Sequence, residues 1–364
     1  VVRPHFPVAS RQRRKPRSIR CDYHSDHGEG RDGTPLRGAF TKGEREESTL
    51  LEERGCRFVS GAAFYRPESA QARDLAVLAA LAYQRRTGRR FRVLDACSGS
   101  GVRGARYLHQ AGVQSVWCND YNSSNGGLLS ANLRGVDDTL RTLTEDQADT
   151  ENIEEAALEG LRGYARQGIV ESVSTTEDEA KSPQTWRVSH YEALRLLTSR
   201  WLAEDYYDLV DVDSFGAQGS FTSAALGAVK HGGLLYLTCT DGLAASGRAP
   251  STALIEYGTY THPTPFANEQ GLRMLIGSAV MEAARRGQTA KPIFSLFSAH
   301  GPVFRVMFEV RKGNDRTQLK DINFIAHCPT TVSCLVISLY SQRSLSYHTQ
   351  TMITCVCVCV YLSV

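Results

Sequence analysis

The sequence predicts an α/β fold in which a mostly parallel sheet is covered by helices on both faces. Residues 91–120 read as an apolar strand, a glycine-rich turn, a helix and a second apolar strand. Residues 207–213, YDLVDVD, read as another apolar strand, and two further apolar strands follow at residues 293–298 and 303–310. Strands that alternate with helices in this order are typical of a parallel sheet, and continuous apolar runs suit strands that are buried on both faces.

The elements before residue 207 follow the same alternation. Apolar residues at helical spacing predict a helix over residues 68–83, before the strand that ends at Asp95. The other elements of this half are expected to be helices at residues 103–109, 128–133 and 192–201 and a strand at residues 187–189.

After residue 213, a helix is expected over residues 222–229, ended by His231-Gly232-Gly233 as its carboxyl-terminal cap. A strand over residues 234–238, a polar loop and a helix over residues 269–286 lead to the two late strands. This order matches the seven-stranded, Rossmann-like sheet of class I methyltransferases better than a nicotinamide-binding domain.

The turn Ser98-Gly99-Ser100-Gly101 is the candidate ligand-binding edge of this sheet. Open parallel sheets bind ligands at the carboxyl ends of their strands, and glycines let the backbone approach a ligand closely. Asp95 ends the strand before the turn, and Asp120 follows the next strand, in a place to accept hydrogen bonds from a ribose. The sequence therefore predicts a nucleoside cofactor bound by Asp95, Ser98, Gly99, Gly101 and Asp120.

Two nucleoside cofactors use an edge of this kind. Gly99, Gly101 and Gly104 match the dinucleotide pattern G-x-G-x-x-G, which is typical of NAD sites. An acid directly before the turn, Asp95, and a basic residue in the first helical turn, Arg103, favour S-adenosylmethionine instead. A tight strand–helix turn that binds no ligand is the structural alternative.

The segment Asp211-Val212-Asp213-Ser214-Phe215-Gly216 is the candidate chemical centre. Methylation of an exocyclic amine of a base is difficult because the amine lone pair is delocalised into the ring. A carboxylate that accepts hydrogen bonds from the amine localises the lone pair and takes up the developing positive charge. We expect Asp213 to orient the amine and Phe215 to stack on the base. In the alternative interpretation, Asp211 and Asp213 cap a loop and Phe215 belongs to the core.

Seven segments occur in order between about Cys56 and Lys312: FYRPESAQARDL, LDACSGSGVRGARY, CND, EALRLL, DVDSFG, LLYLTCTDG and HGPVFRV. Together they resemble the Trm1 family, the tRNA guanine-26 N2-dimethyltransferases. The resemblance implies a class I methyltransferase that uses S-adenosylmethionine to convert one tRNA guanosine to its N2-methyl and then its N2,N2-dimethyl form.

The resemblance also implies roles for individual residues. The cofactor contacts that it carries over are Arg73, Arg103, Asp120 and the pair Glu192-Ala193, and the acid of the fourth-strand motif matches Asp213. The implied partner is tRNA. Two alternatives are an amino methyltransferase that acts on another substrate, such as rRNA or protein amines, and a catalytically weakened RNA-binding paralogue.

The sequence departs from the family pattern in three places. Ser214 stands where the family usually has proline, as in a plant-type subgroup, and serine is expected to alter base positioning or the extent of methylation because proline would stiffen the loop. Glu192 stands where aspartate is usual. The family's carboxyl-terminal domain is expected to be absent after about Lys312, leaving residues 313–364 as an irregular tail.

The flanks and one internal segment differ from the methyltransferase domain expected over residues 50–312. The first 21 residues are basic and contain no acid. Such a start is typical of a chloroplast or mitochondrial transit peptide. A disordered basic arm over residues 1–49 of a nuclear or cytoplasmic protein is the alternative. Residues 135–186 are rich in charge and are expected to form a surface insertion.

Composition narrows the class of protein. The net charge is only +3, so a surface that binds RNA must be local. The ten cysteines include no C-x-x-C pair, which argues against a zinc site and against a secreted disulfide framework. The sequence has no apolar run of transmembrane length. We therefore expect an intracellular protein with no metal and no membrane span.

Overall fold

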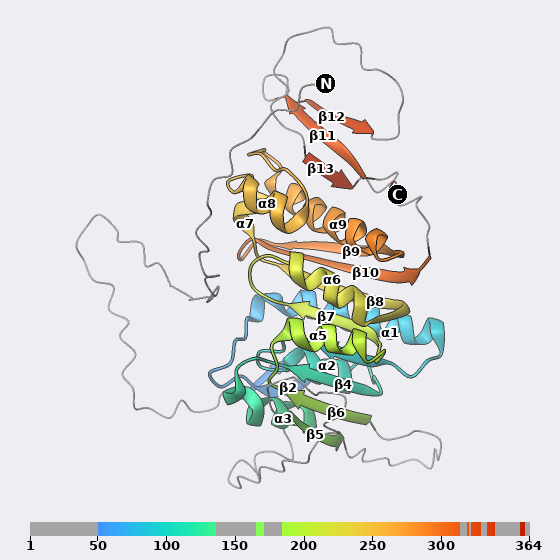
Figure 1. The fold of residues 1–364 in the computed structure, drawn as a ribbon. Helices are drawn as coiled ribbons and strands as arrows, with labels where there is room; N and C mark the ends of the chain where they lie inside the picture. The colour runs from blue at the N-terminus through green and yellow to red at the C-terminus, as the bar shows by residue number, and fades with distance from the viewer. Residues whose placement is uncertain are drawn as a thin grey trace, which may run out of the picture. The chain divides into compact units, whose positions relative to one another are not determined.

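Within the described residues, the central sheet contains eight strands in the order β5-β6-β4-β3-β7-β8-β10-β9 (Figure 1). The computed structural model describes residues 50–135, 165–170, 184–313, 319, 322–328, 333–338 and 357–360, all in the second of two units that divide after Arg45. The strands are β3 (Arg92–Asp95), β4 (Ser115–Asn119), β5 (Ala165–Val170), β6 (Gln184–Ser189), β7 (Tyr207–Asp213), β8 (Val229–Cys239), β9 (Gln288–Ser298) and β10 (Val303–Lys312).

The strand directions confirm the predicted mostly parallel sheet. Strands β6, β4, β3, β7 and β8 are parallel to one another, whereas β10 runs antiparallel to β8 and to β9. The eighth strand, β5, pairs antiparallel with β6 at one edge. It belongs to the segment 135–186 that we predicted to be a surface insertion, so part of that segment extends the sheet.

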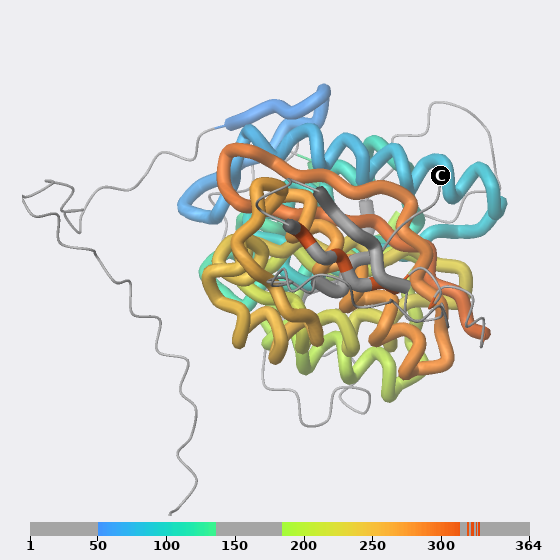
Figure 2. Tube along the Cα trace, turned by 90° about the horizontal axis from the view of Figure 1, so that it is seen from above, coloured from blue at the N-terminus to red at the C-terminus, as the bar shows by residue number. Residues whose placement is uncertain are grey.

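Helices cover both faces of the sheet, as predicted. Figure 2 shows β9 and β10 running between α1 and the helices of the opposite face. Helices α1 (Ala70–Thr87), α2 (Val102–His109) and α3 (Gly126–Arg134) lie over one face, and α5 (Ala193–Leu202), α6 (Gly219–Ala228) and α9 (Ala267–Arg285) lie over the other (Figure 1).

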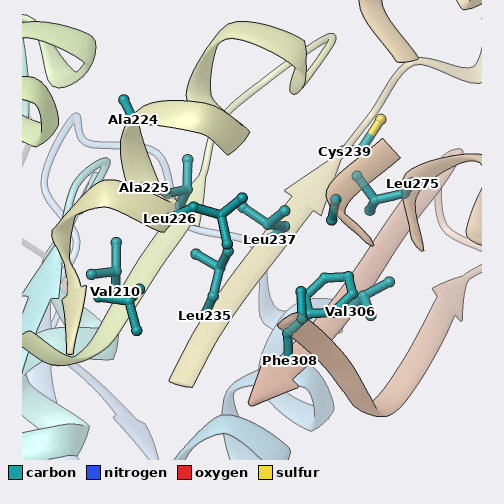
Figure 3. Close-up of a cluster of buried hydrophobic side chains, with 14 of the residues drawn as sticks. Val210, Ala224, Ala225, Leu226, Leu235, Leu237, Cys239, Leu275, Val306 and Phe308 are labelled. Atoms are coloured by element: carbon teal, nitrogen blue, oxygen red, sulfur yellow. The ribbon is translucent and has the colours of Figure 1, made fainter. Parts of the chain in front are cut away.

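Each face of the sheet has its own buried apolar cluster. On one face, Tyr107 of α2 and Leu129 of α3 pack against strand residues such as Val93. On the other, side chains of β7, β8 and β10 meet α6 and α9, and Figure 3 shows Leu226 beside Leu235 and Leu237. Apolar residues that are buried on both faces explain why these strands read as continuous apolar runs.

Two predictions in the second half need correction. His231-Gly232-Gly233 do not cap a helix: α6 ends at Ala228, and these residues belong to β8, where Gly233 pairs with Val310. The polar loop that was expected after β8 contains two short helices, α7 (Gly242–Ala245) and α8 (Pro250–Tyr257).

Two small sheets were not predicted. Strands β1 (Leu50–Glu53) and β2 (Cys56–Val59) form an antiparallel pair before α1. In the tail that we predicted to be irregular, β11 (Ile322–Cys328) pairs with β12 (Ser333–Ser338) and β13 (Cys357–Val360), and β13 lies against α9.

The predicted targeting segment and the helices of the described residues are separate parts of the chain. The predicted basic arm over residues 1–49 lies outside the described residues, so the organellar destination stays a prediction. Among the helices of the described residues, none combines the length and the apolar composition that a membrane span needs.

Strand register gathers polar residues at the carboxyl ends of β3 and β7. Asp95 pairs with Asp211, and Asp213 pairs with Thr238 of β8, which in turn pairs with Arg305 of β10. Residues that are paired across neighbouring strands project to the same face of a sheet. The fold therefore brings these side chains together although they are far apart in the sequence.

Gly104 sets the distance between α2 and the sheet. A Cβ added at this position would lie 2.2 Å from the Cys118 Sγ and 3.3 Å from a methyl group of Val116, both on β4. Real side chains do not approach so closely, so the helix could remain in place only with glycine. The third glycine of the G-x-G-x-x-G pattern is therefore explained by packing.

We predict that Gly104→Ala lowers the free energy of unfolding by about 1–3 kcal/mol, because the added methyl group overpacks the contact with β4. Chemical denaturation followed by circular dichroism measures the change. The matched control is Gly127→Ala in α3, where an added Cβ meets nothing within 4 Å. The control is expected to leave stability unchanged or to raise it by up to about 1 kcal/mol. Equal losses in the two variants would contradict the packing argument.

Candidate active site

Arg103 lies among the acids at the carboxyl ends of β3 and β7. Its guanidinium donates to the Asp211 Oδ1 at 2.5 Å and forms a second short ion pair with Asp213. The Tyr107 hydroxyl donates to the Asp211 Oδ2 at 2.7 Å. Arg103, Tyr107 and Asp211 are buried, so these bonds form in a medium of low polarity where an unpaired charge would be costly. Arg103 was predicted as a cofactor contact; in the structure it is also the direct cation partner of two acids.

Asp213 is an ionised hydrogen-bond acceptor at the edge of this cluster. Its side chain is 27% exposed, and the guanidinium of Arg305 lies 3.9 Å from its Oδ1. Burial alone would raise the pKa of Asp213, but the charges of Arg103 and Arg305 outweigh burial and hold that pKa below its usual value. The carboxylate therefore has the charge that its predicted role requires.

Asp95 differs from Asp213 because burial outweighs the nearby positive charge of Arg103. Both of its carboxyl oxygens are buried and have no hydrogen-bond partner, and the Ser98 hydroxyl donates to the Asp95 backbone carbonyl instead, at 3.1 Å. Burial, followed by the charge of Asp211, raises the pKa of Asp95 to about 8. Asp95 is therefore largely protonated at neutral pH.

A pocket opens beside Asp213 at this edge of the sheet. Of the predicted site residues, it brings together Arg73, Ser98, Gly99, Arg103, Asp213 and Phe215, and it does not include Asp95, Gly101, Asp120, Glu192 or Ala193. The other residues that line it are Tyr65, Phe64, Arg66, Ser69, Cys97, Ser100, Val102, Ser214, Thr240, Val303 and Arg305.

Two exposed aromatic rings border the pocket. Phe215 is 58% exposed and Phe64 is 54% exposed, and their ring centroids lie 5.0 Å apart in an edge-to-face arrangement. An exposed ring at a pocket is not part of a core, so the alternative interpretation of Phe215 as a core residue was wrong. Its ring is in a position to stack on a planar ligand.

The glycine turn is held by its neighbours. Gly99 and Gly101 have φ angles of 56° and 76°, which side chains rarely adopt. The Gly99 N–H donates to the Asp120 Oδ2 at 2.8 Å, and the Asp120 Oδ1 accepts from the Asn122 N–H at 3.0 Å. A Cβ on Gly99 would lie 3.0 Å from the Phe64 carbonyl oxygen. Asp120 thus shapes the turn, and its predicted bond to a ribose would be added to this role.

Arg73 reaches the pocket from α1. It is buried, its Nε donates to the Glu53 Oε1 at 2.8 Å, and one terminal nitrogen donates to the Arg66 carbonyl at 3.0 Å. The Arg106 guanidinium also pairs with the Glu53 Oε1, at 2.5 Å. The β1–β2 pair, which carries Glu53, therefore holds a predicted cofactor contact in place.

Glu192 and Ala193 lie at the start of α5, away from the pocket lining. The exposed Glu192 caps the helix, since its Oε1 accepts from the Leu194 N–H at 3.2 Å. Ala193 is half-buried and packs against the apolar cluster beneath α5. Their contact with a cofactor stays a prediction.

Ser214 has a partner that proline would lack. The Gln218 Nε2 donates to its hydroxyl at 2.6 Å, and Gln218 is buried. The serine thus connects the loop after β7 to the start of α6. A side-chain hydrogen bond therefore holds the loop at the position where the family pattern has the rigid ring of proline.

Sequence reasoning missed several pocket residues. Phe64 and Ser69 line the pocket and belong to the segment FYRPESAQARDL, of which only Arg73 was predicted as a site residue. Thr240 also lines the pocket, and its hydroxyl accepts a hydrogen bond from the Gly216 N–H at 2.7 Å, which holds the loop after β7. Arg305 left a signal in the sequence, because it is a charged residue inside the apolar run VFRVMFEV.

Among the described residues, no group of three or more His, Cys, Asp or Glu side chains is arranged to hold a metal ion.

Comparison with known proteins places this site in context. The model of the N2,N2-dimethylguanosine tRNA methyltransferase family matches residues 46–157 and 147–360. The chain is 27% identical over 268 residues to the tRNA (guanine(26)-N(2))-dimethyltransferase of Methanothermobacter thermautotrophicus, covering 73% of this chain and 57% of that protein. It is 27% identical over 267 residues to the protein of the same name from Thermococcus kodakarensis, covering 72% and 60%. The chain thus spans somewhat over half the length of these relatives.

A solved structure shows the same fold. Trm1 from Pyrococcus horikoshii, in complex with S-adenosyl-L-methionine, is similar with a TM-score of 0.64 and 23% sequence identity, covering 86% of this chain and 73% of that one. The similarity confirms the predicted class I methyltransferase fold.

We predict that Asp95 contributes stability that falls as the pH rises from about 4 to 8, and that Asp95→Asn removes this contribution. The pKa of Asp95 is about 8 in the folded chain and its ordinary value is 3.8, so between these values the folded state binds a proton that the unfolded state has lost. The stabilisation is complete below the lower value and is lost as the pH rises through the upper one.

Denaturant unfolding at pH 5, 6.5 and 8 measures this effect. The unaltered chain is the control, and it should lose more stability across the range than Asp95→Asn. Parallel curves for the two proteins would show that Asp95 is not protonated in the folded state.

Proposed function

The chain belongs to the N2,N2-dimethylguanosine tRNA methyltransferase family, and on that premise we propose that it transfers methyl groups from S-adenosylmethionine to the exocyclic N2 of a guanosine in tRNA. The names of its relatives suggest position 26 of the tRNA. The products would be N2-methylguanosine and N2,N2-dimethylguanosine.

One observation carries the proposal. The Asp213 carboxylate is ionised, partly exposed, and lies in a pocket that is bordered by the exposed rings of Phe64 and Phe215. An anionic acceptor in a pocket with exposed aromatic rings suits a planar base that presents an amine. The same pocket is lined by Ser98 and Gly99, so the amine would lie beside the glycine turn.

The residues at the turn fit the proposed cofactor. Gly99, whose φ angle is positive, lines the pocket, Asp120 adjoins the turn, and the unpartnered carboxyl oxygens of Asp95 lie at the end of the preceding strand. Arg73 and Arg103 line the pocket and could bind the carboxylate of the methionine part. When bound, S-adenosylmethionine would supply an electrophilic methyl group.

Asp213 would act on the amine in two ways. Its oxygen accepts an N2–H hydrogen bond, which directs the nitrogen lone pair away from the ring system, and it takes the N2 proton as the new N–C bond forms. The alkylated amine is a strong acid at that moment, so a carboxylate with a lowered pKa is a sufficient base. Arg103 holds Asp213 by a direct ion pair and thereby limits its rotation.

A second methylation needs the same contacts. After the first transfer, N2 still carries one hydrogen, which can be donated to Asp213 once rotation about the C2–N2 bond has turned the methyl group away. The loop that carries Asp213 is tied to α6 through Ser214 and Gln218. We infer that this tie influences how readily the second methyl group is added.

We predict that Asp213→Asn lowers the rate of methyl transfer by about 100-fold or more, because the amide cannot take the N2 proton. The assay incubates the chain and an unmodified tRNA transcript with methyl-labelled S-adenosylmethionine, and nucleosides are identified by mass spectrometry. Cofactor affinity, measured by calorimetry, should change little.

The matched control is Asp208→Asn, at the opposite end of the same strand, where the carboxylate binds the Arg92 N–H and Lys230. It should keep the transfer rate of the unaltered chain when both are folded. Label in a nucleoside other than methylated guanosine would favour a different substrate, and tRNA binding without any label would favour an RNA-binding role.

A further inference from the structure

We propose that Arg305 makes the site specific for guanine by donating a hydrogen bond to the O6 atom of the base. The inference rests on the proposed function, because it assigns a second contact on the same base. The sequence marks Arg305 only as a charged residue in an apolar run, and its role follows from its position, its partners and the chemistry of the guanine edge.

Arg305 lies on the substrate side of Asp213. The sheet places β3 with its glycine turn on one side of β7, and β8 and β10 on the other. Asp213, Thr238 and Arg305 occupy one row across β7, β8 and β10. A base that is bound at Asp213 would therefore have the glycine turn on one side and the Arg305 guanidinium on the other.

The guanidinium of Arg305 has more donors than partners. The residue is 3% exposed, and its terminal nitrogens lie 3.3 Å from the hydroxyl oxygens of Ser298 and Ser69. The nearest Asp213 oxygen is at 3.9 Å, beyond hydrogen-bond distance, and the Nε–H is buried without a partner. Burial lowers the pKa of Arg305. Arg103, by contrast, is compensated by a direct ion pair, with a carboxylate oxygen of Asp211 at 2.5 Å. A buried cation held by two long bonds to neutral hydroxyls can accommodate a further acceptor.

The pair of Asp213 and Arg305 is complementary to one edge of guanine. That edge presents two donors, the N2 and N1 hydrogens, followed by one acceptor, O6. A carboxylate can accept from both donors, and a guanidinium beside it can donate to O6. Adenine has no amine at C2 and places an amine where O6 would be, so it would set donor against donor and leave Asp213 unpaired. The pocket would therefore exclude adenine by unpaired polar groups.

A different role for Arg305 is to stabilise the charge of Asp213 without touching the base. The two roles differ in what they do to the base edge. A contact with O6 is sensitive to the atom at position 6, whereas a purely electrostatic effect on Asp213 is not.

The test is a double-mutant cycle between the protein and the tRNA. One substrate carries guanosine at the target position, and the other carries 6-thioguanosine, which keeps N1–H and N2 but replaces O6 by sulfur, a weaker acceptor. The measured quantity is kcat/KM for methyl transfer at N2. For the unaltered chain we expect sulfur to lower kcat/KM by about 10-fold or more, as a charged hydrogen bond is weakened.

In Arg305→Met the two substrates should react at similar, lower rates. The matched control is Arg311→Met on the same strand, where the side chain is exposed and pairs with Glu309. The control should keep the full sulfur effect. If Arg305→Met does not fold, the less disruptive Arg305→Gln replaces it and should reduce the sulfur effect to about 3-fold or less, because a neutral amide is a weaker donor.

An undiminished sulfur effect in the Arg305 variants would overturn the inference while leaving the proposed function intact. Methylation of neither tRNA by the unaltered chain would instead overturn the proposed function, and the inference with it.

Discussion

The ion pairs of Arg103 are the interaction on which the site depends. Three acids, Asp95, Asp211 and Asp213, meet where β3 and β7 end, and Arg103 binds two of them directly. Burial and mutual repulsion favour the protonated forms of such neighbouring acids, and the ion pairs with this cation oppose that effect. The acids differ in state: the charges of Arg103 and Arg305 keep Asp213 ionised, whereas burial and the charge of Asp211 keep Asp95 protonated.

Much of the fold could be predicted because the strands are buried on both faces. The run YDLVDVD coincides with β7, and the late strands were expected within a few residues of β9 and β10. The error at His231-Gly232-Gly233 has a physical cause. Two consecutive glycines suggest the end of a helix, because glycine is depleted in strands. Here they belong to the long strand β8, and the hydrogen-bonded pairing of β8 with β10 outweighs this preference. Helix α8 was missed although Pro250 at its start and the left-handed Gly258 at its end were visible signals.

The site was only partly predictable. Asp213 and Phe215 are two residues apart in one motif, and the structure places both at the pocket. Phe64 and Arg305 come from opposite ends of the domain and reach the pocket only through the fold, so local patterns do not show that they meet. For Glu192, a motif in the sequence predicted a cofactor contact, but the side chain caps helix α5 and does not line the pocket. Which polar residues face one another is decided by strand order and register.

The glycine turn keeps its shape through bonds made by the chain itself. The Ser98 N–H donates to the Asn119 carbonyl at 2.8 Å, the Gly99 N–H to Asp120, and the Gly101 N–H to the Ser98 carbonyl at 2.9 Å. Such a loop is preorganised: a ligand that docks there does not lose binding energy to the ordering of flexible backbone. Differences in affinity among cofactor analogues should therefore report on direct contacts, and binding should resemble the docking of two rigid bodies.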